Sequence, residues 1–401
     1  MSHPVLLAVA TVPPWPICNG YALRVYHLLR ELAQAWQIVL IAPAAVVPAA
    51  LRDVLSEYIP VRFAGRWGSL PSQYDTGPFR EAAEWVVAAR KPDAALLWQG
   101  AEFLGFERAF PPAVADRIDC LTLAAWRDRN HAETRREWFS TFSNVRAYAT
   151  YERRLVRALH ATVVVGEDDA RMLRRLTGRH TIHMIPNGVA APPDVESGEG
   201  ATPTVAFTGV LDYQPNVHAA CYFAEKVWPG ILAAVPDARF VIAGQRPLPR
   251  VLALASHPGI DLRADVPDMQ SVLRDAWVAV APMICGSGIK NKVLEAWAAG
   301  RPVAMTTLAT NGLALTPDDQ ELVADDRERL GALIIDLLRD QARRQRLGSA
   351  ARARVLRQHR WEQAAASFTT LLRAPGTAAS QPLPLVSPTH TDPEAPTRLP
   401  A

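Results

Sequence analysis

Short apolar runs alternate with amphipathic stretches along most of this sequence. In the first half the apolar runs cover residues 5–12, 37–42, 94–98 and 161–165, and helical patterns cover 25–36, 81–90 and 168–176. Buried strands that alternate with amphipathic helices are typical of parallel sheets with helices on their faces. The pattern therefore predicts an α/β protein.

One polar stretch interrupts this alternation. Pro192, Pro193 and the acids and glycines up to Gly200 have no helical or strand periodicity, so we place a domain boundary there. The prediction is an N-terminal domain over 1–190, a linker over 191–203 and a C-terminal domain over 204–357. In the second domain strands are expected at 204–208, 239–243, 278–281 and 303–305, and helices at 217–227, 269–275, 291–299 and 330–357.

The end of the chain divides into a helix and a tail. Trp361, Ala365, Phe368 and Leu372 form an apolar stripe at helical spacing, and a helix over 358–373 is expected to pack back on the N-terminal domain. Seven prolines without apolar periodicity follow in 375–401. Such a composition cannot bury enough apolar surface to fold, so 374–401 is predicted to be a disordered tail.

Composition excludes several classes of protein. Hydrophobic residues make up 49% of the chain and charged residues 21%, and no apolar run approaches the roughly 18 residues of a membrane span. The four cysteines lie too far apart for a disulfide framework or a zinc ribbon. A net charge of +3 is too small to indicate a nucleic-acid partner. The start has no basic region before its apolar run, so the expected location is cytoplasmic, with the inner face of the membrane as an option.

Lysine is scarce in this chain. Only four of the 43 basic residues are lysines, and two of them, Lys290 and Lys292, lie two positions apart. A lysine ammonium is a compact point charge that suits phosphate groups.

The two lysines enter a helix directly after a glycine-rich turn. Gly286, Ser287, Gly288 and Ile289 lead into it, and the N-terminus of a helix attracts anions. Lys292 and Glu295 share one face of that helix. The segment therefore predicts a diphosphate site with an adjoining hydroxylated sugar. The spacing matches neither a P-loop nor a dinucleotide fingerprint. The alternative is a pair of solvated lysines, one of them paired with Glu295.

Residues 205–312 resemble the donor-binding half of the retaining GT4 (group 1) glycosyltransferases. The resemblance rests on residues 207–216, 236–244, 266–268 and 282–303, and in the first half on 13–20, Arg24, 164–170 and 185–189. It implies a GT-B fold, in which two Rossmann-like, doubly wound parallel-sheet domains face a central cleft. The nucleotide then lies on the C-terminal domain and the acceptor on the N-terminal domain. The variant motifs resemble a subgroup that serves polysaccharide biosynthesis.

The resemblance also suggests roles for residues. Glu295 matches the second glutamate of the family's E-x7-E motif, which holds the ribose, whereas the first falls at Ser287. The arginine and lysine that commonly clamp the diphosphate fall at Val210 and Asn216. Lys290 and Lys292 are expected to replace them as catalytic residues. The expected donor-binding residues are Gly20, Gly209, Asn216, Arg246, Val266, Gly286, Ser287, Gly288, Ile289 and Glu295.

Two residues at the start of the first domain complete the expected site. Arg24 matches a recurrent family arginine and is expected on the acceptor side, with a solvated helix residue as the alternative. Asn19 stands where relatives have a glycine, and asparagine tolerates left-handed backbone geometry.

The expected activity is transfer of a sugar from a nucleoside-diphosphate sugar to a carbohydrate or lipid-linked acceptor. It is expected to be a hexosyl transfer with retention, in cell-surface polysaccharide synthesis, with no cofactor and no metal. In the family view the leaving phosphate accepts the proton of the acceptor. Two alternatives stay open: a sugar-nucleotide epimerase or hydrolase on the same fold, and a non-catalytic donor-binding protein.

Residues 127–157 combine aromatic and basic side chains. Eight arginines and four acids are interleaved with five aromatic residues, and Trp126 directly precedes them. One interpretation is a peripheral contact with an anionic membrane or a lipid-diphosphate acceptor. The other, which we favour, is a salt-bridged helical face whose aromatic side is buried.

Overall fold

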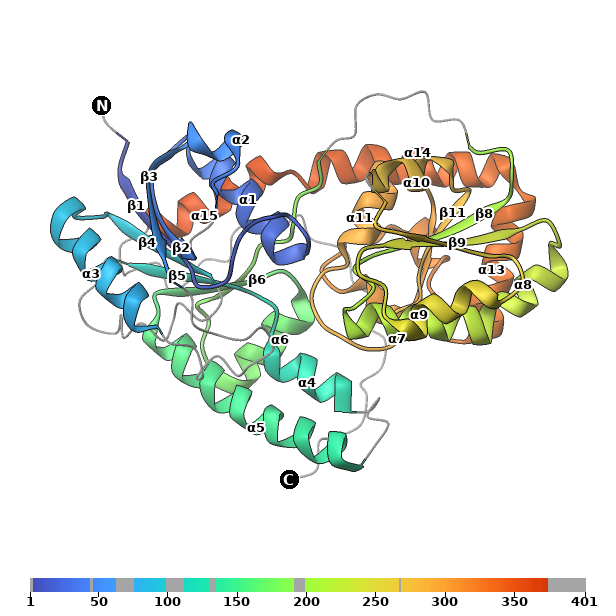
Figure 1. Cartoon of the computed structure of the whole chain (residues 1–401), viewed down its shortest axis with the longest axis horizontal. Coiled ribbons are helices and arrows are strands. Elements are labelled where there is room, and N and C mark those ends of the chain that lie inside the picture. The colour runs from blue at the N-terminus through green and yellow to red at the C-terminus, as the bar shows by residue number, and fades with distance from the viewer. Residues whose placement is uncertain are drawn as a thin grey trace.

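A computed structural model describes residues 3–43, 46–62, 76–98, 112–129, 135–190, 199–266 and 268–373. Most of the predicted linker, 191–198, and the predicted tail, 374–401, lie outside the described residues. Two α/β bodies stand side by side along the long axis of the molecule (Figure 1). Among the described helices, none has both the length and the apolar character needed to span a bilayer.

The N-terminal body is built on a seven-stranded parallel sheet in the order β3-β2-β1-β4-β5-β6-β7. Its strands are β1 (Val5–Ala10), β2 (Gln37–Pro43), β3 (Leu55–Val61), β4 (Ala94–Trp98), β5 (Ala113–Ile118), β6 (Ala161–Val164) and β7 (Ile182–Met184). Its helices are α1 (Gly20–Leu32), α2 (Ala49–Arg52), α3 (Gly77–Arg90), α4 (Leu121–Arg129), α5 (Arg135–Ala158) and α6 (Glu167–Thr177).

The C-terminal body has a five-stranded parallel sheet in the order β10-β9-β8-β11-β12. Its strands are β8 (Thr204–Thr208), β9 (Arg239–Gly244), β10 (Ile260–Ala264), β11 (Val278–Ala281) and β12 (Val303–Met305). Its α-helices are α7 (Gln214–Tyr222), α8 (Trp228–Ala234), α9 (Pro249–Leu252), α10 (Met269–Asp275), α11 (Asn291–Ala298), α12 (Pro317–Gln320), α13 (Arg327–Arg339) and α14 (Gln341–Gln358). Shorter turns of other helix types are η3 (Phe223–Val227), η4 (Ala253–Ser256) and η5 (Thr307–Thr310).

Both faces of each sheet are covered. Along β1, Leu6, Ala8 and Ala10 face one apolar cluster, whereas Leu7 and Val9 face another. This alternation follows from the two-residue period of a strand, and burial on both sides explains why such strands are continuous apolar runs. The predicted α/β fold class is confirmed.

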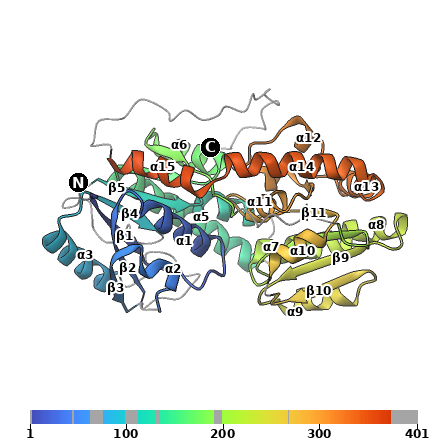
Figure 2. The same cartoon turned by 90° about the horizontal axis from the view of Figure 1, so that it is seen from above.

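The last helix, α15 (Trp361–Arg373), follows α14 but belongs to the core of the N-terminal body. In Figure 2, α13, α14 and α15 form a row that crosses from one body to the other. Trp361, Phe368 and Leu372 are buried in the cluster around α1 and β1. The Trp36 Nε1–H donates to Thr369 Oγ1 at 3.2 Å. The end of the chain therefore ties the two bodies together.

Local chemistry explains where the elements differ from the sequence-based expectations. The helix expected over 330–357 is two helices, because the side chain of Asp340 caps the second by accepting from the Arg343 amide at 2.9 Å. The helix expected from 217 begins at Gln214, with Pro215 in its first turn. Strands β3, β5 and β10 were not predicted.

The packing of α15 predicts that Phe368→Ala destabilises the N-terminal body. The ring is fully buried, so removing it is expected to lower the free energy of unfolding by about 3–5 kcal/mol. Thr370→Ala, on the exposed side of the same helix, is the control and is expected to change it by less than about 0.5 kcal/mol. Thermal and denaturant unfolding measure both variants. Equal effects of the two would contradict this assignment.

Candidate functional site

The site lies where the carboxyl ends of β8 and β11 face the N-terminal body. The loop 282–290 leads from β11 to α11, and Gly286 and Gly288 adopt φ angles of 94° and 69° there. These angles favour glycine because it lacks a Cβ atom. Ligands of parallel α/β sheets bind at this edge, beyond the ends of the strands.

Lys290 holds the shape of this loop. Its Nζ donates to the carbonyl oxygens of Ser287 at 2.6 Å and Gly288 at 2.8 Å. The side chain is buried, and burial lowers the pKa of its ammonium, whereas Asp119 and Asp169 act in the opposite direction. Two of the three N–H groups of the Lys290 ammonium therefore bond to the loop, and its positive charge lies next to the loop backbone.

Lys292 points to the end of β8. Its Nζ donates to Asn216 Oδ1 at 2.8 Å and lies 3.8 Å from the centroid of the Phe207 ring. A Cβ atom added to Gly209 would come within 3.1 Å of the same Nζ. Burial, followed by the charge of Lys290, lowers the pKa of Lys292 to about 7. Among the described residues, no carboxylate forms an ion pair with either ammonium.

Two helix N-termini meet across the boundary between the bodies. A Cβ atom on Gly20, the first residue of α1, would lie 3.0 Å from Asn291 Nδ2, at the first residue of α11. The expectation for Asn19 is wrong: its φ is −156°, and its side chain caps α1 by accepting from the Ala22 amide at 2.8 Å. Both helices direct the positive ends of their dipoles toward this point.

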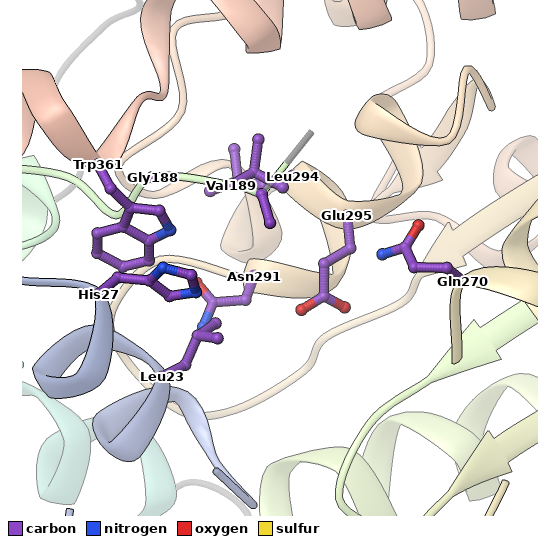
Figure 3. Close-up of a pocket in the computed structure, with 10 residues that line it drawn as sticks. Leu23, His27, Gly188, Val189, Gln270, Asn291, Leu294, Glu295 and Trp361 are labelled. Atoms are coloured by element: carbon purple, nitrogen blue, oxygen red, sulfur yellow. The ribbon is translucent and has the colours of Figure 1, made fainter. Parts of the chain in front are cut away.

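Glu295 borders a cavity of about 140 Å³ between α1, α11 and α15. Figure 3 shows Glu295 and Gln270 on one side of it and the rings of His27 and Trp361 on the other. The two rings stack with centroids 4.9 Å apart, and burial lowers the pKa of His27 to about 4, so the imidazole is neutral near pH 7. Burial raises the pKa of Glu295, and Lys292 opposes that shift.

Two polar groups at this cavity have no hydrogen-bond partner among the described residues. They are Gln270 Oε1, an acceptor, and Trp361 Nε1, a donor. Gln270 was not singled out in the sequence, and Trp361 was expected only as part of an apolar stripe. A buried polar atom without a partner is costly.

Asp119 of the N-terminal body lies against the loop 282–290, which we call the donor loop. It follows β5, and a Cβ atom on Gly288 would collide with its carboxylate. Burial raises the pKa of Asp119, the nearby Asp169 raises it further, and Lys290 counteracts both. The sequence analysis missed Asp119, because β5 carries charged residues and was not predicted as a strand.

Polar contacts join the two bodies around this point. Asn311 Nδ2 donates to Asp169 Oδ2 at 2.8 Å, and the Asp168 amide donates to Asn311 Oδ1 at 3.2 Å. Arg127 pairs with Asp168 at 2.6 Å and donates to the Gly286 carbonyl at 3.4 Å. The donor loop is therefore braced from the N-terminal body.

Comparison with known proteins places this geometry. Residues 202–340 match the family model described as glycosyl transferases group 1. A GDP-mannose-dependent monoacylated alpha-(1-6)-phosphatidylinositol monomannoside mannosyltransferase of Corynebacterium glutamicum is 30% identical over 161 residues, which are 37% of this chain and 42% of the relative. The chain thus matches about two-fifths of that relative's length.

Solved structures agree over more of the chain. The crystal structure of Anabaena Alr3699/HepE in complex with UDP-glucose has a TM-score of 0.64 at 14% identity, covering 92% of this chain and 100% of that one. WaaG, a glycosyltransferase involved in lipopolysaccharide biosynthesis, has a TM-score of 0.60 at 12% identity, with 92% and 99% covered. Residues 202–340 are thus similar to group 1 glycosyl transferases, and the chain has the GT-B fold.

The remaining expected donor residues, Arg246, Val266 and Ile289, differ in their distance from the loop 282–290. Arg246, with φ at 53°, is half-exposed and forms a two-bond pair with Asp212 at 2.6 and 3.2 Å. Val266 is partly buried and packs against the apolar cluster that includes Val241 and Val272. Ile289 contacts the apolar clusters of both GT-B bodies. The structure thus brings Gly20, Gly209, Asn216, Ser287 and both lysines together and leaves Arg246 and Val266 at the margin.

The two interpretations of Arg24 are both wrong. The side chain is fully buried, with its Nε 2.7 Å from Asp116 Oδ2 and its Nη1 2.6 Å from Asn187 Oδ1. It also lies 5.5 Å from the Phe368 ring. Arg24 therefore holds α1, β5 and α15 of the GT-B fold together and has no surface open to an acceptor.

The close approach of Gly288 to Asp119 predicts a sensitive position. Gly288→Ala adds a methyl group at a positive φ, directly against the Asp119 carboxylate, so the loop and the N-terminal body have to separate. We expect UDP and GDP affinity, measured by calorimetry, to fall at least about tenfold, or ~1.4 kcal/mol. Gly230→Ala is the control, because nothing lies within 4 Å of its added Cβ atom. Equal affinities for the two variants would contradict the placement of the site.

Proposed function

We propose that this protein transfers a sugar from a nucleoside-diphosphate sugar to a carbohydrate or lipid-linked acceptor. We further propose that it is a retaining hexosyltransferase that needs neither a cofactor nor a metal and serves cell-surface polysaccharide synthesis. The observation that carries the proposal is the ammonium of Lys292, on the first turn of α11, which lies beside Gly209 and Asn216 at the end of β8, together with the cavity bordered by Glu295.

The diphosphate, the ribose and the base of the donor would each contact a different part of this site. The diphosphate would lie at the N-terminus of α11, beside the loop 282–290 and near the Lys292 ammonium. The ribose hydroxyls would donate to Glu295, and the rest of the nucleoside would fill the cavity of Figure 3. The UDP-glucose bound in HepE and the GDP-mannose in the relative's name support this donor class.

Catalysis would rest on stabilising the charge of the departing diphosphate. Lys292 and the amides at the helix mouth are already in place, so they need little reorganisation as the charge develops. Removing one such donor from an enzyme typically costs about 2.7–4 kcal/mol of transition-state stabilisation. The leaving phosphate would accept the acceptor's proton, and domain closure would exclude water. Asp119 faces the loop where the usual first glutamate is replaced by Ser287, and it would accept a hydrogen bond from the transferred sugar.

One observation favours a second candidate. The raised pKa of Asp119, a carboxylate at the donor loop, is what a general base or acid near neutral pH requires. A sugar-nucleotide hydrolase or epimerase would use it on a donor-bound water or hydroxyl. Release of nucleoside diphosphate without an acceptor, abolished by Asp119→Asn, would establish that alternative in place of transfer.

The donor site predicts a specific loss of activity. Glu295→Gln retains the shape of the side chain but removes the charge that accepts two ribose hydroxyls, and Lys292→Ala removes the cation. Each is expected to lower kcat/KM at least about tenfold, or ~1.4 kcal/mol. The assay measures release of nucleoside diphosphate from UDP- and GDP-sugars with and without glycan and lipid-linked acceptors. Unchanged kinetics in both variants would rule out this donor site.

The depressed pKa of Lys292 predicts how donor affinity depends on pH. The free ammonium is charged below about pH 7 and neutral above it. A bound diphosphate favours the charged form, so binding above pH 7 requires proton uptake. The Kd of a nucleotide sugar is therefore expected to rise with pH, by at most about tenfold per unit. Nucleotide sugars suit this test because their diphosphate diester does not titrate in this range.

The controls separate Lys292 from general charge effects. Lys292→Gln is expected to bind the donor weakly and to lose the dependence between pH 7 and 9. Lys226→Gln removes an exposed lysine of the same domain and is expected to behave like the wild type. A flat wild-type profile would contradict a diphosphate at Lys292.

A further inference from the structure

The exposed side of α5 carries a cluster of aromatic rings that the donor site does not use. Trp138, Phe139 and Phe142 are 41%, 66% and 38% exposed. Trp138 packs on Phe142 with ring centroids 5.7 Å apart and on Phe139 at 5.2 Å. Large apolar side chains that touch one another on a surface, away from the core, mark an interaction site.

The same side of α5 is basic. Five arginines lie on it with exposed side chains: Arg135, Arg146, Arg153, Arg154 and Arg157. Glu152 faces inward, where it accepts from the Leu121 amide and from the Thr122 hydroxyl. Among the described side chains of this helix, none on the exposed side is acidic, and none of the five arginines pairs with a described carboxylate. We call these three rings and five arginines the α5 face.

This arrangement corrects the interpretation favoured from the sequence. A salt-bridged helix with a buried aromatic side was expected over 127–157. Instead, Trp126, Tyr148 and Tyr151 are partly buried, whereas the three rings at the start of α5 point outward. Arg127 forms an ion pair with Asp168, but that pair lies next to the donor loop and not on the α5 face.

We propose that the α5 face binds the surface of an anionic lipid bilayer. The arginines would be attracted to acidic headgroups, and the rings would enter the boundary between headgroups and acyl chains. A single-stranded nucleic acid is the main rival for a basic, aromatic surface, but bases stack on open ring faces. Here Trp138 and Phe142 are parallel to within 1° and stack on each other, so each of these rings already has one face covered by the other.

The α5 face adjoins the donor loop through α4. The Arg129 guanidinium lies 3.9 Å from the Trp126 ring centroid and 6.0 Å from that of Trp138. Two residues earlier on α4, Arg127 donates to the Gly286 carbonyl. A bilayer on this face would thus bring a lipid-linked acceptor to the side of the cleft. That last step rests on the proposed function, whereas bilayer binding does not.

The test is co-sedimentation of the full chain with vesicles of phosphatidylcholine alone and of phosphatidylcholine mixed with phosphatidylglycerol. We expect binding to the mixed vesicles that weakens with salt. Phe139→Ser/Phe142→Ser and Arg146→Gln/Arg154→Gln are each expected to lower the partition coefficient at least about tenfold. Two controls match them: Trp85→Ser, a 51% exposed tryptophan on α3, and Arg327→Gln/Arg346→Gln, which removes the same charge elsewhere. Both controls are expected to bind as the wild type does.

Three results would overturn the proposal: no binding of the wild type to anionic vesicles at low salt, equal losses in the controls, or displacement of the protein from vesicles by a single-stranded oligonucleotide that binds the α5 face. Circular dichroism verifies the fold of each variant. Calorimetry with UDP- and GDP-sugars on the same proteins keeps the two claims apart, because changes in the α5 face are expected to leave donor affinity unchanged.

Discussion

The desolvated ammonium of Lys292 is the constraint on which the site depends. It is held by the amide oxygen of Asn216 and the aromatic face of Phe207, and no described carboxylate forms an ion pair with it. A buried cation in such a place is unfavourable unless an anion joins it. This charge stays open toward the cleft for two reasons. Gly209 has no side chain that would cover it, and Lys290 fixes the loop that leads into α11.

The second body completes the site instead of merely covering it. Gly20 of α1 faces Asn291, and Asp119 at the end of β5 faces Gly288. The chain passes between the bodies twice, after Val189 and again near His359. These two segments lie side by side: the Val189 amide donates to the His359 carbonyl at 2.8 Å, and Asn187 O lies 3.0 Å from His359 Nδ1. The buried Arg24–Asp116 pair anchors this region to the N-terminal core. A ligand at the N-terminus of α11 would therefore lie close to residues of both bodies.

The sequence predicts the elements whose burial leaves a local pattern. The bounds of β4, β8 and β11 follow directly from apolar runs, and the glycine-rich turn before α11 predicts an anion site. Strand β5 escapes because Asp116 and Arg117 lie within it, and their burial is tolerated only through partners far away in the chain, such as Arg24. Two contacts of the site also join residues far apart in the sequence, so no local motif predicts them: Lys292 with Asn216, and Asp119 with Gly288. Arg24 shows the converse: a motif match fixes a position but not its environment.

A crystal structure with a bound nucleotide sugar tests the central claim most directly. The proposed site predicts the diphosphate at the N-terminus of α11, with a phosphate oxygen about 2.7–2.9 Å from Lys292 Nζ and the ribose hydroxyls on Glu295. A diphosphate bound elsewhere, with Lys292 still donating only to Asn216, would contradict it.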